Sequence, residues 1–255
     1  MPNESNSLDV LGIKPIADSV NTVTQGAVDG ASAFLARICL PAAEEFGLLL
    51  KDHVSAWRAN NAVKIATKAQ ALVEQQAVKV AISAHPRMIY ATIENGSWAE
   101  EDLMQNFWAG LLASSCTPNG KDESNLIFIN MLSQLTSSQA KLIKYVCENV
   151  GIYKSIAGWI GADNLFMEAD ELIKITGIED LHQLDRELDH LRALELIRGG
   201  FAPESTIADV TPHALCLQLY VRSQGYVGSP IDYFGDRVRS TYVEPASPID
   251  GTDSE

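Results

Sequence analysis

The amino-acid sequence predicts a mainly α-helical fold, in which an N-terminal multi-helix domain is followed by a winged-helix-like C-terminal domain with a small β-hairpin. Three observations support this prediction: apolar residues recur every three or four positions through the first half, helix-capping patterns are repeated, and two short β-type stretches follow the helices of the last third. The expected organisation is a polar leader at 1–14, a helical domain at 15–135, a winged-helix-like domain at 136–225 and an acidic, partly disordered tail at 226–255.

Two helices are expected between about Ile16 and Leu50, because small and apolar residues alternate there at helical spacing and Pro41 can start a second helix. A longer helix is expected from about Trp57 to Ile82. With a rotation of about 100° per residue, its apolar face consists of Ala62, Ile65, Ala69, Leu72, Val73 and Val80, and a polar stripe nearly opposite consists of Lys64, Lys68, Gln75 and Lys79.

Capping patterns mark the helices in the middle of the chain. Pro86 is expected to end the long helical segment, and Ser97 to Glu100 then form an S-x-x-E pattern, in which each side chain satisfies a free backbone amide of the other residue. Thr136 to Gln139 repeat this type of pattern. The predicted helices therefore run from Trp98 to just before Pro118, from Asp122 to Leu135, and from the second pattern to about Asn149.

The last third of the chain follows a helix-turn-helix order. Its predicted elements are a short helix near Glu168–Ile175, a turn at Thr176-Gly177, a helix from about Asp180 to Leu194, two pairing stretches at 196–201 and 207–210, and a helix that Thr211 caps, Pro212 begins and Tyr220 ends. The two pairing stretches would form the wing of a winged-helix domain, spanning about 196–210.

Composition and charge indicate an ordinary soluble protein. The chain is 46% hydrophobic and 20% charged, and 33 acidic against 19 basic residues give a formal net charge of −14. This charge opposes non-specific attraction to nucleic acid or anionic lipid. Because the polar, acidic N-terminus lacks a secretory signal, we expect a cytoplasmic protein, whose four widely spaced cysteines are isolated buried thiols.

One region of the chain is basic. Residues 51–90 contain six basic and two acidic side chains, a net of +4 that leaves −18 for the remainder. The simpler interpretation is a solvated helix face that complements acidic neighbours, and the alternative is contact with phosphates, lipid headgroups or an acidic partner. The residues considered for partner or phosphate contact are Lys64, Lys68 and Lys79 in or near this helix and Arg186, Arg192 and Arg198 in the C-terminal domain.

Motifs for the common catalytic and cofactor-binding sites are absent from the sequence. It contains no phosphate-binding P-loop, dinucleotide-binding glycine pattern, H-E-x-x-H pair or G-x-S-x-G elbow, and its five histidines are scattered. We therefore expect no cofactor, no metal and no small-molecule substrate. Carboxylates do cluster at 100–102 and at Asp185, Glu187 and Asp189. Because a site built from dispersed carboxylates would leave no motif, non-enzymatic action is the expectation and the enzyme question stays open.

The central stretch resembles the abortive-infection alpha family of bacterial proteins. The resemblance is carried by an acidic helix start at Glu100-Glu101-Asp102, by the apolar run Phe107-Trp108-Ala109-Gly110-Leu111-Leu112-Ala113, and by residues 126–142. It is clear over about 85–150 and weaker over about 15–85. It implies a role in defence against phage, but no catalytic residues, because the family is not tied to an established catalytic centre. The apolar motif itself predicts core packing, with Phe107, Trp108, Leu111 and Leu112 filling the interior.

Three functions remain open from the sequence. The first is a non-enzymatic interaction or regulatory component of an abortive infection system, which acts through a protein partner or self-association. The second is a DNA-binding transcriptional regulator, although residues 178–192, which would probe the major groove, carry five acids and two arginines. The third is a membrane-perturbing effector that uses the apolar 27–50 region on activation, a region interrupted by charged residues.

Overall fold

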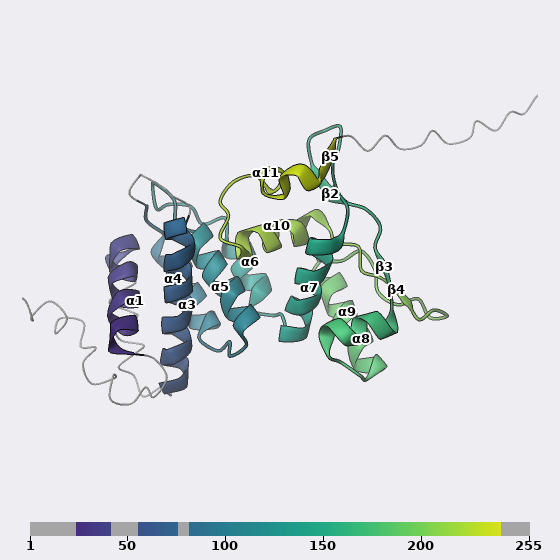
Figure 1. The fold of residues 1–255 in the computed structure, drawn as a ribbon, viewed down its shortest axis with the longest axis horizontal. Coiled ribbons are helices and arrows are strands. Elements are labelled where there is room, and N and C mark those ends of the chain that lie inside the picture. The colour runs from purple at the N-terminus through teal and green to yellow at the C-terminus, as the bar shows by residue number, and fades with distance from the viewer. Residues whose placement is uncertain (1–23, 42–55, 76–81, 241–255) are drawn as a thin grey trace, which may run out of the picture.

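Helices α3 (Ala56–Gln75) and α5 (Asp102–Ser114) pack against each other in the N-terminal half of the protein, with α1 (Gln25–Ile38) beside α3 and α4 (Pro86–Gly96) beside α5 (Figure 1). The computed structural model describes residues 24–41, 56–75 and 82–240. The mainly helical fold predicted from the sequence is confirmed.

Helix α1 confirms one of the two helices expected between 16 and 50. It begins after Thr24, whose hydroxyl accepts a hydrogen bond from the Ala27 amide, and it buries Val28, Phe34 and Leu35. The backbone is helical again at Leu40 and Pro41. The rest of the 27–50 region and the leader at 1–14 lie outside the described residues. Within the described segments, no helix is both long and apolar enough to cross a bilayer.

The two faces predicted for α3 are confirmed where the structure describes them. Ala62, Ile65 and Ala69 are fully buried, whereas Lys64 is exposed. The helix is described as far as Gln75, so Lys79 and Val80 lie outside the described residues. Periodicity predicted these positions correctly because α3 packs against α1, α4 and α5 while the Lys64 position stays exposed.

The expected helix start at Trp98 is wrong. Pro86 was expected to end a helical segment, but it is the first residue of α4, a helix that was not predicted. The His85 side chain caps this helix. Ser97 is the C-cap of α4, and α5 begins only at Asp102. The Ser97 hydroxyl donates to the carbonyl of Glu94 and so is not an N-cap acceptor.

The second capping pattern behaves as predicted. Helix α7 (Ser137–Asn149) begins with a capping box in which the Thr136 hydroxyl and the Gln139 side chain each bond the backbone amide of the other residue. The helix before it, α6 (Leu126–Leu132), is shorter than the predicted 122–135.

A small sheet follows α7 and was not predicted. Strands β1 (Ile152–Lys154) and β2 (Ile160–Ala162) form an antiparallel pair, and β5 (Val238–Ser240) joins β1 in parallel. Helix α11 (Pro230–Phe234) and the 3₁₀ turn η3 (Gly235–Arg237) lead to β5 and pack near α10. The first part of the predicted tail is therefore folded, and residues 241–255 lie outside the description.

The C-terminal helices occur in the predicted order. The elements are β3 (Phe166–Glu168), α8 (Ala169–Thr176), α9 (Leu181–Ala193), β4 (Ile207–Asp209) and α10 (Ala214–Ser223). Strand β4 pairs antiparallel with β3, and the expected pairing of 196–201 with 207–210 consists of the Phe201–Ala208 bridge and the hydrogen bond from the Asp209 amide to the Gly200 carbonyl. In α9, Leu184, Leu188 and Leu191 are core residues.

The predicted cap of the last helix is displaced by two residues. Helix α10 begins after His213, because the Thr211 hydroxyl instead accepts a hydrogen bond from the Leu165 amide. Pro212 forms an isolated bridge with Ile197.

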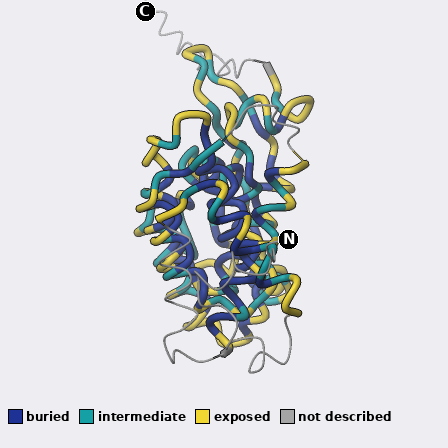
Figure 2. The backbone as a smooth tube through the Cα atoms, turned by 90° about the vertical axis from the view of Figure 1, so that its left-hand side faces the viewer, coloured by how far each residue is buried: buried dark blue, intermediate teal, exposed yellow. Residues whose placement is uncertain are grey.

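The two halves share one hydrophobic core, which runs through the middle of the molecule (Figure 2). Helix α10 packs against α5 so closely that a Cβ atom at Gly110 would overlap the backbone carbonyl of Ser223. In the same core the Sγ atoms of Cys147 and Cys216 lie 3.8 Å apart. These two buried thiols are therefore not isolated from each other, although all four cysteines are free.

Candidate partner-binding groove

The loop between α4 and α5 presents Trp98 to solvent, with 60% of its surface exposed. Arg58 of α3 lies beneath it, and its guanidinium carbon is 4.2 Å from the centre of the indole. Arg58 is only 5% exposed: its Nε donates to the Ser97 hydroxyl at 2.9 Å, and its second nitrogen lies 3.1 Å from a carboxylate oxygen of Glu94. Trp57 adds a tilted ring contact at 6.1 Å. The exposed indole is thus held in place from below.

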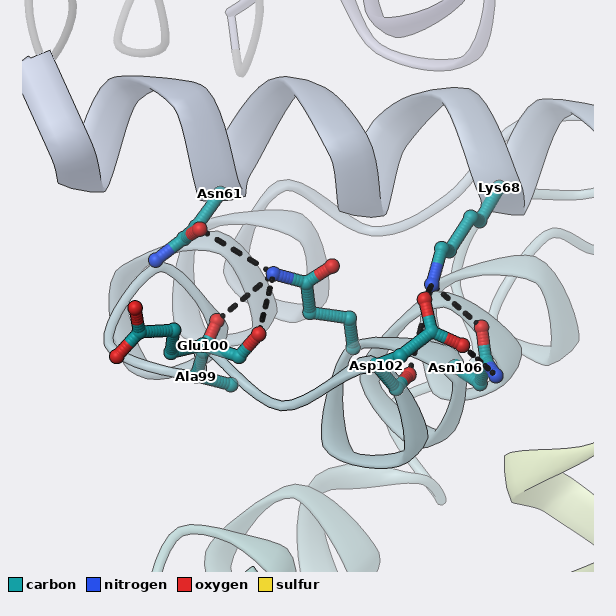
Figure 3. Close-up of polar contacts among 7 residues, drawn as sticks. Asn61, Lys68, Ala99, Glu100, Asp102 and Asn106 are labelled. Carbon is teal, nitrogen blue, oxygen red and sulfur yellow. Dashed lines mark hydrogen bonds and ion pairs between the residues drawn. The ribbon is translucent and has the colours of Figure 1, made fainter. Parts of the chain in front are cut away.

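Two buried amides hold the backbone of the same loop (Figure 3). Asn61 of α3 donates to the Ser97 carbonyl at 3.1 Å, and Gln105 of α5 donates to the carbonyl of Ala99 at 3.0 Å and to the Asn61 side chain at 3.2 Å. Both amides are 2% exposed. Because buried amides are costly to leave unpaired, this network restricts the loop to one position.

A groove of about 710 Å³ opens beside Trp98. Its lining residues are Asn95, Trp98, Ala99, Glu100, Glu101, Met104, Trp108, Leu132, Ser133, Leu135, Thr136 and Ser137. The apolar members Met104, Trp108, Leu132 and Leu135 are core residues that are each 7% exposed or less, so they border the groove with little open surface. Within the described part of the chain, two carboxylates and no basic residue line it.

The two carboxylates of the groove differ in their partners. Glu101 pairs with Lys141 at 3.0 Å, and hydrogen bonds from Ser137 and from Lys141 lower the pKa of this carboxyl below its usual value. Glu100, by contrast, makes no ion pair with any residue that the structure describes. Glu100 is therefore the carboxylate of the groove that is available to an occupant.

Lys64 and Lys68, two of the lysines predicted as contact residues, belong to α3 and do not line the groove. Lys68 places its ammonium nitrogen 2.5 Å from a carboxylate oxygen of Asp102 and 2.7 Å from the Asn106 side-chain oxygen (Figure 3), and the pKa of Asp102 is lowered by this lysine. Lys64 is exposed and makes no ion pair with described residues. Lys68 therefore complements an acidic neighbour within the fold, as the simpler interpretation expected.

The predicted arginines lie far from these lysines, in and after α9, on the opposite side of α5 and α7 (Figure 1). Arg192 pairs with Asp189 at 2.6 Å, and Arg198 donates to the Asn164 side chain at 2.6 Å. Arg186 is exposed and has no ion pair among the described residues. The five predicted contact residues that the structure describes therefore do not form one surface, and Lys79 lies outside the described residues.

The acidic run at 100–102 does not form a converging cluster. Glu101 forms an ion pair with Lys141 of α7, and Asp102 forms one with Lys68 of α3. No group of three or more potential metal ligands occurs among the residues that the structure describes. The groove was not predicted, because the capping pattern placed Trp98 inside a helix. The one local signal in the sequence is a tryptophan close to three consecutive acidic residues.

The family comparison covers the groove, although Arg58 and Trp57 lie just before the matched residues. The sequence model of a family described as abortive infection alpha matches residues 60–210, which is more than half of the chain. The chain belongs to the abortive infection alpha family. This match extends well beyond the resemblance at 85–150, from α3 past β4, and so includes every residue of the groove. The search of curated proteins and the search of solved structures gave no significant match.

The residues that carry the family resemblance have two structural roles. Phe107, Leu111 and Leu112 are buried, which confirms the predicted core packing. Trp108 is buried too, but part of its surface lines the groove with Leu132 and Leu135. In this abortive infection alpha protein, the resemblance motif therefore also shapes a surface depression.

Proposed function

We propose that this protein is a non-enzymatic interaction component of a bacterial abortive infection system, and that it acts in the cytoplasm by binding a protein partner through the groove beside Trp98. Membership of the abortive infection alpha family supports the setting. The observation that carries the mechanism is the exposed Trp98, held beside a groove by the buried side chains of Arg58, Asn61 and Gln105.

This arrangement has the features of a binding hot spot. Tryptophan and arginine are enriched among the few interface residues that carry most of the binding energy, and pre-ordering of the contact residues reduces the entropy lost on association. A loop that only joined α4 to α5 would not need a buried arginine to fix an indole that remains 60% exposed. Removing Trp98 should therefore weaken partner binding without opening the core.

A plaque assay with two matched tryptophan variants tests the proposal. Cells that carry the complete native operon are challenged with phage to which that operon confers resistance, with wild type, Trp98→Ala and Trp159→Ala compared at equal protein levels. Trp159 is 74% exposed in the β1–β2 turn, outside the groove. We expect Trp98→Ala to lose most of its protection and Trp159→Ala to retain it. Full protection by Trp98→Ala would contradict the proposal.

A second proposal concerns the C-terminal region. We infer that α7, β3, α8, α9, the 196–201 stretch and β4 form a winged-helix arrangement, which the order of these elements and the β3–β4 pairing support. Two of the three arginines near its probing helix have partners within the fold, and that helix is acidic. DNA regulation is therefore the less favoured function, and a gel shift at low salt that detects binding to duplex DNA would reverse this order.

A further inference from the structure

We propose that the groove beside Trp98 receives a cationic side chain, arginine in preference to lysine, from an apolar segment of the partner protein. This inference rests on the proposed function and names the chemistry of its partner. Part of the groove lining is apolar, including Met104 and Leu135, and suits an aliphatic or aromatic neighbour of that cation. The negative charge of the groove favours a cationic side chain over a neutral or acidic one.

Charge complementarity is set by Glu100. The other carboxylate, Glu101, already has Lys141 and Ser137 as partners. Glu100 has no ion pair in the described structure, and none of the described lining residues is basic. A cation near Glu100 would gain a carboxylate that no described residue pairs with, and this charge complementarity favours a cationic partner.

The same loop already shows how it holds a guanidinium. Arg58 combines contact with the Trp98 indole, a carboxylate from Glu94 and the hydroxyl of Ser97. The groove offers the same three kinds of group: the exposed part of Trp98, the carboxylate of Glu100, and hydroxyls of the α6–α7 junction such as Ser133. Arginine suits this set better than lysine, because its planar group can stack on an indole while its edge donates hydrogen bonds.

Charge also excludes other occupants. Nucleic acid and anionic lipid would bring phosphates to Glu100 in a protein whose net charge is −14. The chain's own residues 241–255 contain four acids and no lysine or arginine, so they do not fit either. A cationic protein segment is the remaining macromolecular occupant with complementary chemistry.

The probe for this inference is a set of three fluorescently labelled peptides of equal length, in which leucine alternates in an amphipathic pattern with arginine, lysine or glutamate. Fluorescence anisotropy at physiological salt measures their binding to the full chain. We expect the leucine/arginine peptide to bind most tightly and the leucine/glutamate peptide not to bind. Equal binding of the arginine and glutamate peptides, or no binding of the arginine peptide, would overturn the inference.

Two charge-matched variants separate the groove from general attraction to an acidic protein. Glu100→Gln should weaken binding of the leucine/arginine peptide about tenfold, which is the size expected for a close charge pair of about 1.4 kcal/mol. Glu204→Gln removes the same charge from an exposed loop outside the groove and should leave binding unchanged. Equal weakening by both variants would show non-specific attraction and overturn the inference.

The two proposals fail in different ways. If the Trp98→Ala variant loses phage protection while the wild-type protein does not bind the leucine/arginine peptide, the proposed function stands and the inference of a cationic occupant is wrong. If Trp98→Ala keeps full protection, the proposed function is wrong whatever the peptide does. Urea unfolding of each variant ensures that only folded proteins are compared.

Discussion

The crossing of α5 with α10 and the docking of the 97–101 loop on α3 are both closely packed, but they use different chemistry. At the crossing, Gly110 lies against the backbone of Ser223, and apolar residues such as Phe107 surround it. At the loop, the buried groups are polar, and Arg58 and Asn61 bond directly to it. Apolar contact holds two helices together without much directionality, whereas hydrogen bonds select one loop conformation.

This difference in chemistry indicates different roles for the α5–α10 crossing and for the 97–101 loop. The crossing joins the two halves into one hydrophobic core. The loop network buries polar groups while the Trp98 side chain stays exposed. Buried polar groups add little net stability, but they fix the conformation of a contact surface before a partner binds. Mutations should therefore affect stability at the crossing and both stability and binding at the loop.

The largest effect is expected at the helix crossing. Gly110→Ala places a methyl group against the Ser223 carbonyl and should lower the free energy of unfolding by about 3 kcal/mol, because packed helices cannot separate without losing other contacts. Gly30→Ala is the control: a Cβ there meets nothing within 4 Å inside α1, so the variant should gain about 0.5–1 kcal/mol from helix propensity. Urea unfolding measures both, and changes of the same sign would contradict the packing argument.

An intermediate effect is expected at the loop. Arg58→Met removes the hydrogen bonds to Ser97 and Glu94 and should lower the free energy of unfolding by about 2 kcal/mol. It should also speed hydrogen exchange of the backbone amides of the 97–101 loop, which a change in global stability alone would not confine to that loop. The matched control is Arg87→Met, which breaks an exposed ion pair with Glu123 and should change stability by less than about 0.5 kcal/mol.

The smallest effect is expected at the exposed Lys68–Asp102 pair. The pKa of Asp102 is lowered in the folded state, so its contribution to stability is present above the unfolded-state pKa near 4 and is lost as the pH falls through the lower folded-state value. Lys68→Met should therefore lower stability by about 0.5 kcal/mol at pH 7 and by less at pH 3.

The neighbouring exposed lysine serves as the reference for this pair. Lys64→Met removes the same charge one turn earlier in α3, where no described residue forms an ion pair with it and its charge is only a minor cause of the lowered pKa of Asp102, so its effect should be smaller at either pH. Urea unfolding of both variants at pH 7 and pH 3 measures the difference. A loss of stability for Lys68→Met that grows toward acid pH would contradict the assigned pair.

Local sequence patterns predicted the regular helices well. The two faces of α3, the capping box at Thr136 and the start of α9 near Asp180 all match the structure. These features depend on residues within a few positions of each other, so a window of sequence contains all the interacting partners. The strands β1, β2 and β5 were missed, because three residues are too few to display a period.

The sequence by itself determined where most helical segments other than α4 lie, which side of α3 is apolar, and to which family the central stretch is similar. Only the tertiary structure decided the role of Ser97. Its S-x-x-E pattern looks like that of a helix start, but Arg58, distant in sequence, binds its hydroxyl and makes it part of the support for Trp98. A hydroxyl can satisfy a local or a distant partner equally well, and the folded chain selects between them through the surrounding packing.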